Sequence, residues 1–152
     1  RAEVSQGTPL GIKVKSVMDS GHLVSDELLI EIMESVFVNN STVQGFVLDG
    51  FPRTLNQAQE LDRMLAKHGQ QVSLVLALEV DEDELVSRLL NRAREQGRLD
   101  DTEAVIKNRL IQYHHHTKPL IDYYLDQKLY TEVYGVGTIE DIFSQLCSVI
   151  KQ

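Results

Sequence analysis

The segment from Gly45 to Thr54 carries the side chains best suited to chemistry in this sequence. It reads GFVLDGFPRT, so a short apolar run leads into an acid, a glycine and an arginine. The run Phe46–Leu48 predicts a buried central strand, and Asp49 would stand at its carboxyl end, which is the ligand edge of an open parallel sheet. A carboxylate there suits Mg²⁺ or its waters, and the planar fork of Arg53 suits phosphate. The simpler interpretation is a buried strand followed by a loop without chemistry.

Four further arginines, in the second half of the chain, carry side chains suited to phosphate. Arg88 and Arg92 are four residues apart on one predicted helix and therefore share a face. Arg98 lies beyond the end of that helix, and Arg109 lies on the next one. Folded together, these guanidinium groups can surround a phosphate group from several sides, as phosphoryl transfer requires. For any single arginine, a solvated charge on a helix surface is an equally good interpretation.

The elements that must position these residues alternate between helices and strands. This order predicts an α/β fold with a parallel sheet flanked by helices. In the first half of the chain we expect a helix from Pro9 to Gly21 capped by Thr8, a helix opening at Ser25–Glu27, the strand ending at Asp49, and a helix over Leu55–His68. In the second half we expect a buried strand over Val72–Leu78, a helix from Asp81 to about Glu95, and a helical stretch from Thr102 that kinks at Pro119. A strand over Leu129–Tyr134 and a helix capped by Thr138 complete the predicted elements.

Composition and charge narrow the function classes. With 152 residues, 42% of them hydrophobic, the chain can bury one core, so we expect one domain over residues 1–152. A net charge of −8 argues against general binding to nucleic acid or to a membrane surface. The sequence has no apolar run long enough to cross a bilayer and no signal-peptide pattern, so a cytoplasmic location is expected.

The motif DGFPRT, followed by Gln57, closely resembles the central signature of the adenylate kinases, and the resemblance extends along the whole chain. It implies a P-loop nucleoside monophosphate kinase fold. Within that fold it implies a helical AMP-binding arm over residues 1–45, a core over 46–91 and 104–152, and a short lid over 92–103. The implied activity is the reversible transfer of a phosphoryl group from MgATP to AMP, giving two ADP, by a monomer.

The resemblance also implies roles for individual residues. Those implied to bind AMP are Arg1, Leu23, Val24, Gly50, Arg53, Gln57, Arg98 and Arg109, with the amide of Gln57 on the adenine edge. Those implied to bind ATP are Arg88, Arg92 and Gly137. The arginines implied to be catalytic are Arg53, Arg88, Arg98 and Arg109. Asp49 is implied to hold Mg²⁺ through water, with Asp100 and Asp101 as an acidic pair beside the phosphates.

The sequence departs from the family pattern in two places. Only five residues separate Arg92 from Arg98, too few for the long lid of many bacterial members, and the single cysteine cannot build a zinc-binding lid. The family's first strand and its phosphate loop, of the G-x-x-x-x-G-K-[ST] kind, do not occur in these 152 residues. Backbone N–H groups of that loop cradle the phosphates, so we expect an N-terminally truncated chain that is inactive by itself.

Two other functions stay open at this point. A UMP/CMP kinase would share the scaffold, but those enzymes resemble DGFPRN with an asparagine near the base, whereas Thr54 and Gln57 favour adenine. A catalytically inactive nucleotide-binding module derived from a kinase would account for the missing phosphate loop. The retained arginines argue against that alternative.

Overall fold

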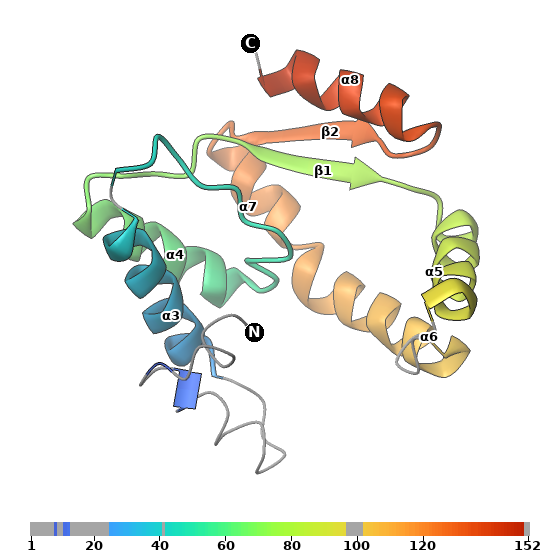
Figure 1. Cartoon of the computed structure of the whole chain (residues 1–152), viewed down its shortest axis with the longest axis horizontal. Helices are drawn as coiled ribbons and strands as arrows, with labels where there is room; N and C mark the ends of the chain where they lie inside the picture. Colours follow the sequence, from blue (N-terminus) through green and yellow to red (C-terminus); the bar gives the residue numbers. More distant parts are fainter. Residues whose placement is uncertain (1–7, 9–10, 13–24, 41, 97–101, 151–152) are drawn as a thin grey trace. The chain divides into compact units, whose positions relative to one another are not determined.

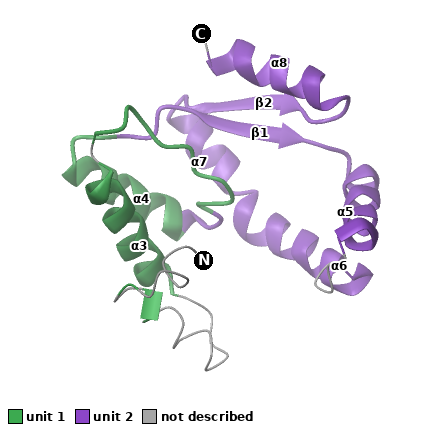
Figure 2. Cartoon of the chain, in the orientation of Figure 1, with its two compact units in different colours: residues 1–52, 56–70 green, residues 53–55, 71–152 purple. Residues whose placement is uncertain are grey.

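The computed structural model describes residues 8, 11–12, 25–40, 42–96 and 102–150, which fall into two compact units (Figures 1 and 2). Unit 1 comprises residues 1–52 and 56–70, and unit 2 comprises residues 53–55 and 71–152. The predicted N-terminal helix lies almost wholly outside the described residues. Its predicted cap is confirmed, because the Thr8 hydroxyl accepts a hydrogen bond from the Gly11 amide at 3.0 Å.

The first helix of unit 1 that the structure describes in full is α3 (Asp26–Asn39), and it begins where the sequence predicted. Ser25 is the N-cap, and its hydroxyl accepts a hydrogen bond from the Leu28 amide at 3.3 Å. Asp26 and Glu27 place two acids in the first turn, where they interact favourably with the helix dipole. The pKa of Glu27 is lowered, first by its backbone hydrogen bond and then by the Ser25 hydroxyl.

The core of unit 1 is formed mainly by α4 (Leu55–Lys67), whose predicted bounds are confirmed to within one residue. Leu61 and Met64 are each 1% exposed, which makes them the most buried large side chains of this unit. Burying each such side chain stabilises the fold by about 1.5–3 kcal/mol. The buried apolar side chains of unit 1 are Leu28, Ala58, Leu61, Met64 and Leu65.

The strand predicted over Phe46–Leu48 is wrong. These residues have no regular secondary structure, and Val47 is 97% exposed. The ring of Phe46 packs on Phe37 of α3, with centroids 4.1 Å apart. An extended apolar segment becomes a strand only through hydrogen bonds to a neighbouring strand. In the part of the chain that the structure describes, the sheet has two strands, and neither pairs with this segment.

The sheet of unit 2 consists of β1 (Val75–Glu79) and β2 (Tyr130–Tyr134), which run parallel (Figure 1). The register pairs Val75 with Tyr130 and Glu79 with Tyr134. Both strands were predicted, but β1 begins three residues later than expected. It is also less buried than expected, because Leu78 is 54% exposed and the core contribution comes from Val133 of β2, at 4%.

The helices of unit 2 also follow the sequence pattern. The helical stretch that follows Thr102 ends in a π-helical turn over Tyr113–Thr117. It breaks near Pro119, as predicted, and a separate helix begins at Leu120. Thr138 caps the last helix, with its hydroxyl accepting from the Asp141 amide at 3.1 Å. The helices are α5 (Glu82–Gln96), α6 (Glu103–Gln112), η1 (Tyr113–Thr117), α7 (Leu120–Asp126) and α8 (Ile139–Ile150).

Helices α7 and α8 both pack against β2. The buried apolar side chains of unit 2 are Ile106, Leu120, Tyr124 and Val133. A parallel strand pair reached through helical crossovers is the expected outcome of the alternating pattern. Among the residues that the structure describes, no helix is both long and apolar enough to span a membrane.

Candidate functional site

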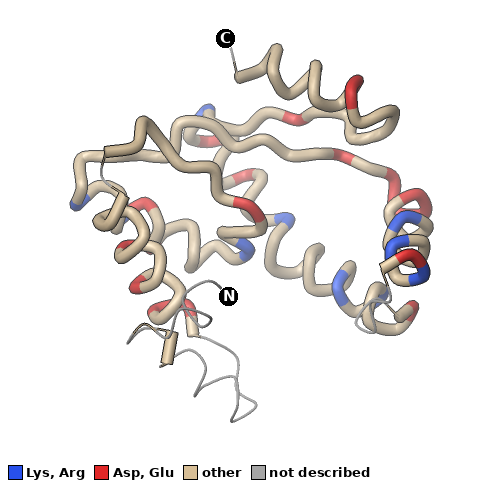
Figure 3. The backbone as a smooth tube through the Cα atoms, viewed as in Figure 1, with Lys and Arg blue, Asp and Glu red and all other residues tan. Residues whose placement is uncertain are grey.

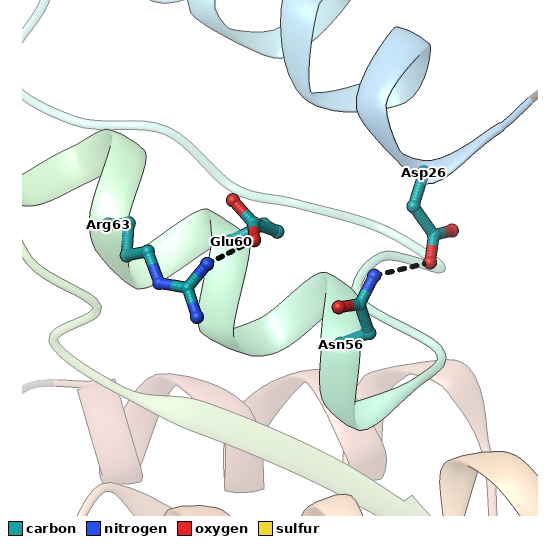
Figure 4. A network of polar contacts seen from close by, with 4 residues as sticks. All are labelled: Asp26, Asn56, Glu60 and Arg63. Atoms are coloured by element: carbon teal, nitrogen blue, oxygen red, sulfur yellow. Dashed lines mark hydrogen bonds and ion pairs between the residues drawn. The ribbon is translucent and has the colours of Figure 1, made fainter.

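Gln57, the predicted base-reading residue, is in the first turn of α4 and is only 8% exposed. Its Nε2 donates a hydrogen bond to Oδ1 of Asp26 at 2.7 Å. Asn56, the preceding residue, donates from Nδ2 to the other carboxylate oxygen, Oδ2, at 2.9 Å (Figure 4). One carboxylate on α3 therefore holds two consecutive amides of α4, and it satisfies a buried polar group that would be costly to leave unpaired.

The same contact supplies charge to the start of α4. No acidic residue lies in the first turn of this helix, so its N-terminal dipole has no local anion. Asp26 brings a carboxylate to that turn from the neighbouring helix, at hydrogen-bond distance from the side chains of Asn56 and Gln57. The sequence predicted Asp26 at the start of a helix within the AMP-binding arm, but not its contact with residues 30 and 31 positions away, because nothing local in the sequence indicates that contact.

The loop that follows the apolar run presents its acid and its glycine to solvent. Asp49 and Gly50 are both exposed, and Gly50 has φ 68°, a conformation that glycine adopts without the steric cost met by other residues. Arg53 is also exposed, and its backbone carbonyl accepts a hydrogen bond from the Thr117 hydroxyl at 2.9 Å. Asp49, Gly50 and Arg53 are therefore all open to solvent.

Arg88 and Arg92 lie on α5, along which acidic and basic residues are mixed (Figure 3). Both are half-buried. The Arg88 guanidinium donates from Nε to Oε1 of Glu84 at 2.7 Å and from Nη1 to the Gly135 carbonyl at 2.9 Å. Arg88 is 40% exposed and Glu84 44%, so this pair contributes little to stability and leaves the guanidinium near solvent.

The Arg88 contact connects a predicted phosphate-binding residue to the loop that contains Gly137, a residue implied to bind ATP. Gly135 is buried, and its amide donates to the Glu79 carbonyl at 2.7 Å, across the ends of the two strands. A Cβ at this position would lie 2.8 Å from Cγ2 of Val80 and 3.2 Å from the Glu79 carbonyl oxygen, so any larger residue would force its neighbours to shift. Gly137, the predicted ATP contact, follows in the same loop with φ 133°.

The structure describes only some of the remaining predicted site residues. Arg109 is exposed in the last turn of α6. The structure brings Arg88 together with the loop that contains Gly137, and it places Gln57 in a polar contact within unit 1. The predicted residues that fall outside the described part of the chain are Arg1, Leu23, Val24, Arg98, Asp100 and Asp101.

The described residues include no group of three or more His, Cys, Asp or Glu side chains arranged to hold a metal ion. Mg²⁺ in phosphoryl-transfer sites needs no such cage, because it keeps several waters and binds through substrate phosphates and one or two carboxylates. A single exposed carboxylate such as Asp49 fits that requirement.

The elements and their order define a mixed α/β protein, and comparison with known proteins gives its family. A family model described as "Adenylate kinase" matches residues 1–129. The adenylate kinase of Bacteroides thetaiotaomicron is 48% identical over 100% of this chain and 80% of the relative. The adenylate kinase of Phocaeicola vulgatus is 44% identical over 100% of this chain and 80% of the relative. That of Stenotrophomonas maltophilia K279a is 42% identical over 99% of this chain and 81% of the relative. The chain belongs to the adenylate kinase family, and the predicted family and fold class are confirmed.

Proposed function

We propose that the protein catalyses reversible phosphoryl transfer from MgATP to AMP, which gives two ADP. The observation that carries the proposal is family membership over the whole chain, including the DGFPRT motif and Gln57. The substrates are ATP, AMP and ADP. The proposal includes action as a monomer in the cytoplasm, where adenine nucleotides are present.

The AMP side of the proposed site recognises base and phosphate by different means. An amide offers a donor and an acceptor side by side, so Gln57 reads the adenine edge through paired hydrogen bonds. The backbone around Leu23 and Val24 approaches the base. The guanidinium groups of Arg1 and Arg53 bind the phosphate, and the positive φ of Gly50 supports a tight loop beside it.

The phosphoryl-transfer side depends on arginine. Two nucleotides bring several negative charges together, and further charge develops on the equatorial oxygens of the transferring group. Arg88, Arg92, Arg98 and Arg109 neutralise that charge and orient the phosphates. No side chain needs to act as a strong base, because the attacking oxygen already belongs to an anionic phosphate. The contact between Arg88 and the Gly135 carbonyl supports a fixed position for one of these groups.

Mg²⁺, when bound together with ATP, would offset the negative charge of the phosphates. Asp49 would hold the ion through water, and Asp100 and Asp101 would be the acidic pair beside the phosphates. Gly137 and its loop pack against the adenine of ATP.

The proposal is tested by steady-state kinetics on the full-length gene product. ATP and Mg²⁺ are supplied with AMP, UMP or CMP, and ADP formation is followed by a coupled assay. We expect kcat/KM for AMP to exceed that for either pyrimidine nucleotide by at least about tenfold. Equal rates with all three acceptors, or no transfer to AMP, would overturn the proposal.

A further inference from the structure

The contact between Asp26 and Gln57 fixes which end of the Gln57 amide is the nitrogen. A carboxylate has acceptors only, so the group at 2.7 Å from its Oδ1 must be the donor Nε2. Turning the amide by 180° would bring Oε1 against Oδ1, replacing a charge-assisted hydrogen bond by repulsion between two acceptors. Asp26 therefore permits one orientation of the amide.

Asp26 is itself held in place from two sides. Its second oxygen accepts from Asn56 at 2.9 Å, and Figure 4 shows the two side chains pointing toward each other from α3 and α4. Its backbone belongs to the first turn of α3, which the Ser25 cap stabilises. The carboxylate can therefore impose its direction on Gln57.

The orientation of an amide decides which purine it can pair with. On the Watson–Crick edge, adenine presents a donor at the 6-position beside an acceptor at N1, and it pairs with amide oxygen and amide nitrogen in that order. A 6-oxopurine presents an acceptor at the 6-position beside a donor at N1, so the same pair requires the amide to be turned over. The Gln57 amide nitrogen carries two hydrogens. The hydrogen anti to Oε1 can be donated to Asp26, while the hydrogen syn to Oε1 can be donated to the base together with the bond that Oε1 accepts.

We propose that Asp26 is a positioning residue that selects 6-aminopurine over 6-oxopurine nucleotides, because its carboxylate fixes the Gln57 amide in the orientation that adenine requires. This inference rests on the proposed function, in which Gln57 reads the base. It goes beyond that function by assigning the choice between AMP and IMP to a residue of α3.

The test compares Asp26→Asn with matched variants in the full-length protein. An asparagine at position 26 either accepts or donates, so it accommodates both orientations of Gln57. Glu27→Gln is the control, because it removes the same charge from the same helical turn. Asn56→Ala is an intermediate case, because it removes one of the two contacts that hold the Asp26 carboxylate in place.

The measured quantity is the ratio of kcat/KM for AMP to kcat/KM for IMP, with the dissociation constants of both nucleotides from calorimetry. We expect Asp26→Asn to lower the AMP:IMP ratio by about tenfold, within the range for one bidentate base contact. Glu27→Gln should keep the wild-type ratio, and Asp26→Glu, which remains acceptor-only, should largely retain it. Asn56→Ala, which loosens the Asp26 carboxylate but keeps it acceptor-only, should lower the ratio by less than Asp26→Asn does. If Asp26→Asn does not fold, Asp26→Ser supplies a group that can also donate or accept, with the same expected loss.

The outcomes separate this inference from the proposed function. Absence of transfer to AMP in the wild type would refute the proposed function. Normal AMP activity in the wild type, together with an unchanged AMP:IMP ratio in Asp26→Asn or Asp26→Ser, would refute the positioning role and leave Asp26 as a link between α3 and α4. A fall in the ratio of similar size in Glu27→Gln would also refute it, because charge alone would then account for the effect.

Discussion

The two units of the molecule hold their predicted site residues in different ways. In unit 1, Gln57 is 8% exposed and is fixed by a carboxylate from a neighbouring helix. In unit 2, Arg88 is 40% exposed and Arg109 lies on the helix surface. The difference matches two kinds of recognition. Choosing between bases requires desolvated groups with one orientation, whereas neutralising phosphate requires charge that remains accessible.

The largest effect should come from removing an arginine on the phosphate side. We expect Arg88→Ala, Arg92→Ala or Arg109→Ala in the full-length protein to lower kcat by about 10²–10³-fold, because each loses contact with charge that develops in the transition state. The melting temperature should fall only modestly even in Arg88→Ala, because the exposed pair with Glu84 contributes about 0–1 kcal/mol and the hydrogen bond to the Gly135 carbonyl about 1 kcal/mol. Steady-state kinetics and thermal unfolding of the same preparations check both statements.

Two other arginines provide the matched controls. Arg63 pairs with Glu60 on the same helix, and its side chain is 64% exposed (Figure 4). Arg94 is exposed in the last turn of α5. Arg63→Ala and Arg94→Ala should keep kcat within about twofold, because a solvated helix charge contributes little. A comparable loss of kcat in these variants would contradict the division between phosphate-binding and solvated arginines.

A smaller effect is expected on the base-reading side. Gln57→Ala should weaken discrimination between AMP and the pyrimidine monophosphates by about 1–3 kcal/mol, the range for a lost bidentate base contact. It should act mainly on the AMP specificity ratio rather than on the rate with saturating AMP. Measurement of kcat/KM for AMP, CMP and UMP checks this, and an unchanged specificity ratio would show that Gln57 does not read the base.

The sequence predicted those features that depend on local pattern. The cap at Ser25, the start of α5, the break near Pro119 and the strand at residues 130–134 follow from spacing and residue type, and all appear in the structure. The motif around Asp49 also gave the family, because several residue types recur there in a fixed order.

Features that depend on distant partners could not be predicted. The run Phe46–Leu48 has the composition of a buried strand, but strand formation requires a paired neighbour, which composition does not supply. The Asp26–Gln57 bond joins residues 31 positions apart, and the Arg88–Gly135 bond joins residues 47 apart. Asp26 is typical of a helix start, and Arg88 is typical of the exposed face of a helix. Because these local features already explain both residue types, the sequence gives no sign of the distant partners.

The smallest predicted effect compares one helix cap from each unit. Ser25 and Thr138 both accept a hydrogen bond from the amide three residues on, at 3.3 and 3.1 Å. Ser25→Ala and Thr138→Ala should therefore each lower the free energy of unfolding by about 1 kcal/mol, measured by urea denaturation of the full-length protein. Ser25 precedes the residue that holds Gln57, so only Ser25→Ala should also raise the KM for AMP at saturating ATP, by about twofold to fivefold at the energies of a lost cap. Thr138→Ala, with the same loss of stability, should leave this KM unchanged, because α8 carries none of the predicted AMP-binding residues. Equal changes of KM in the two variants would mean that reduced stability alone weakens AMP binding, and that the start of α3 has no special part in placing the base-reading amide.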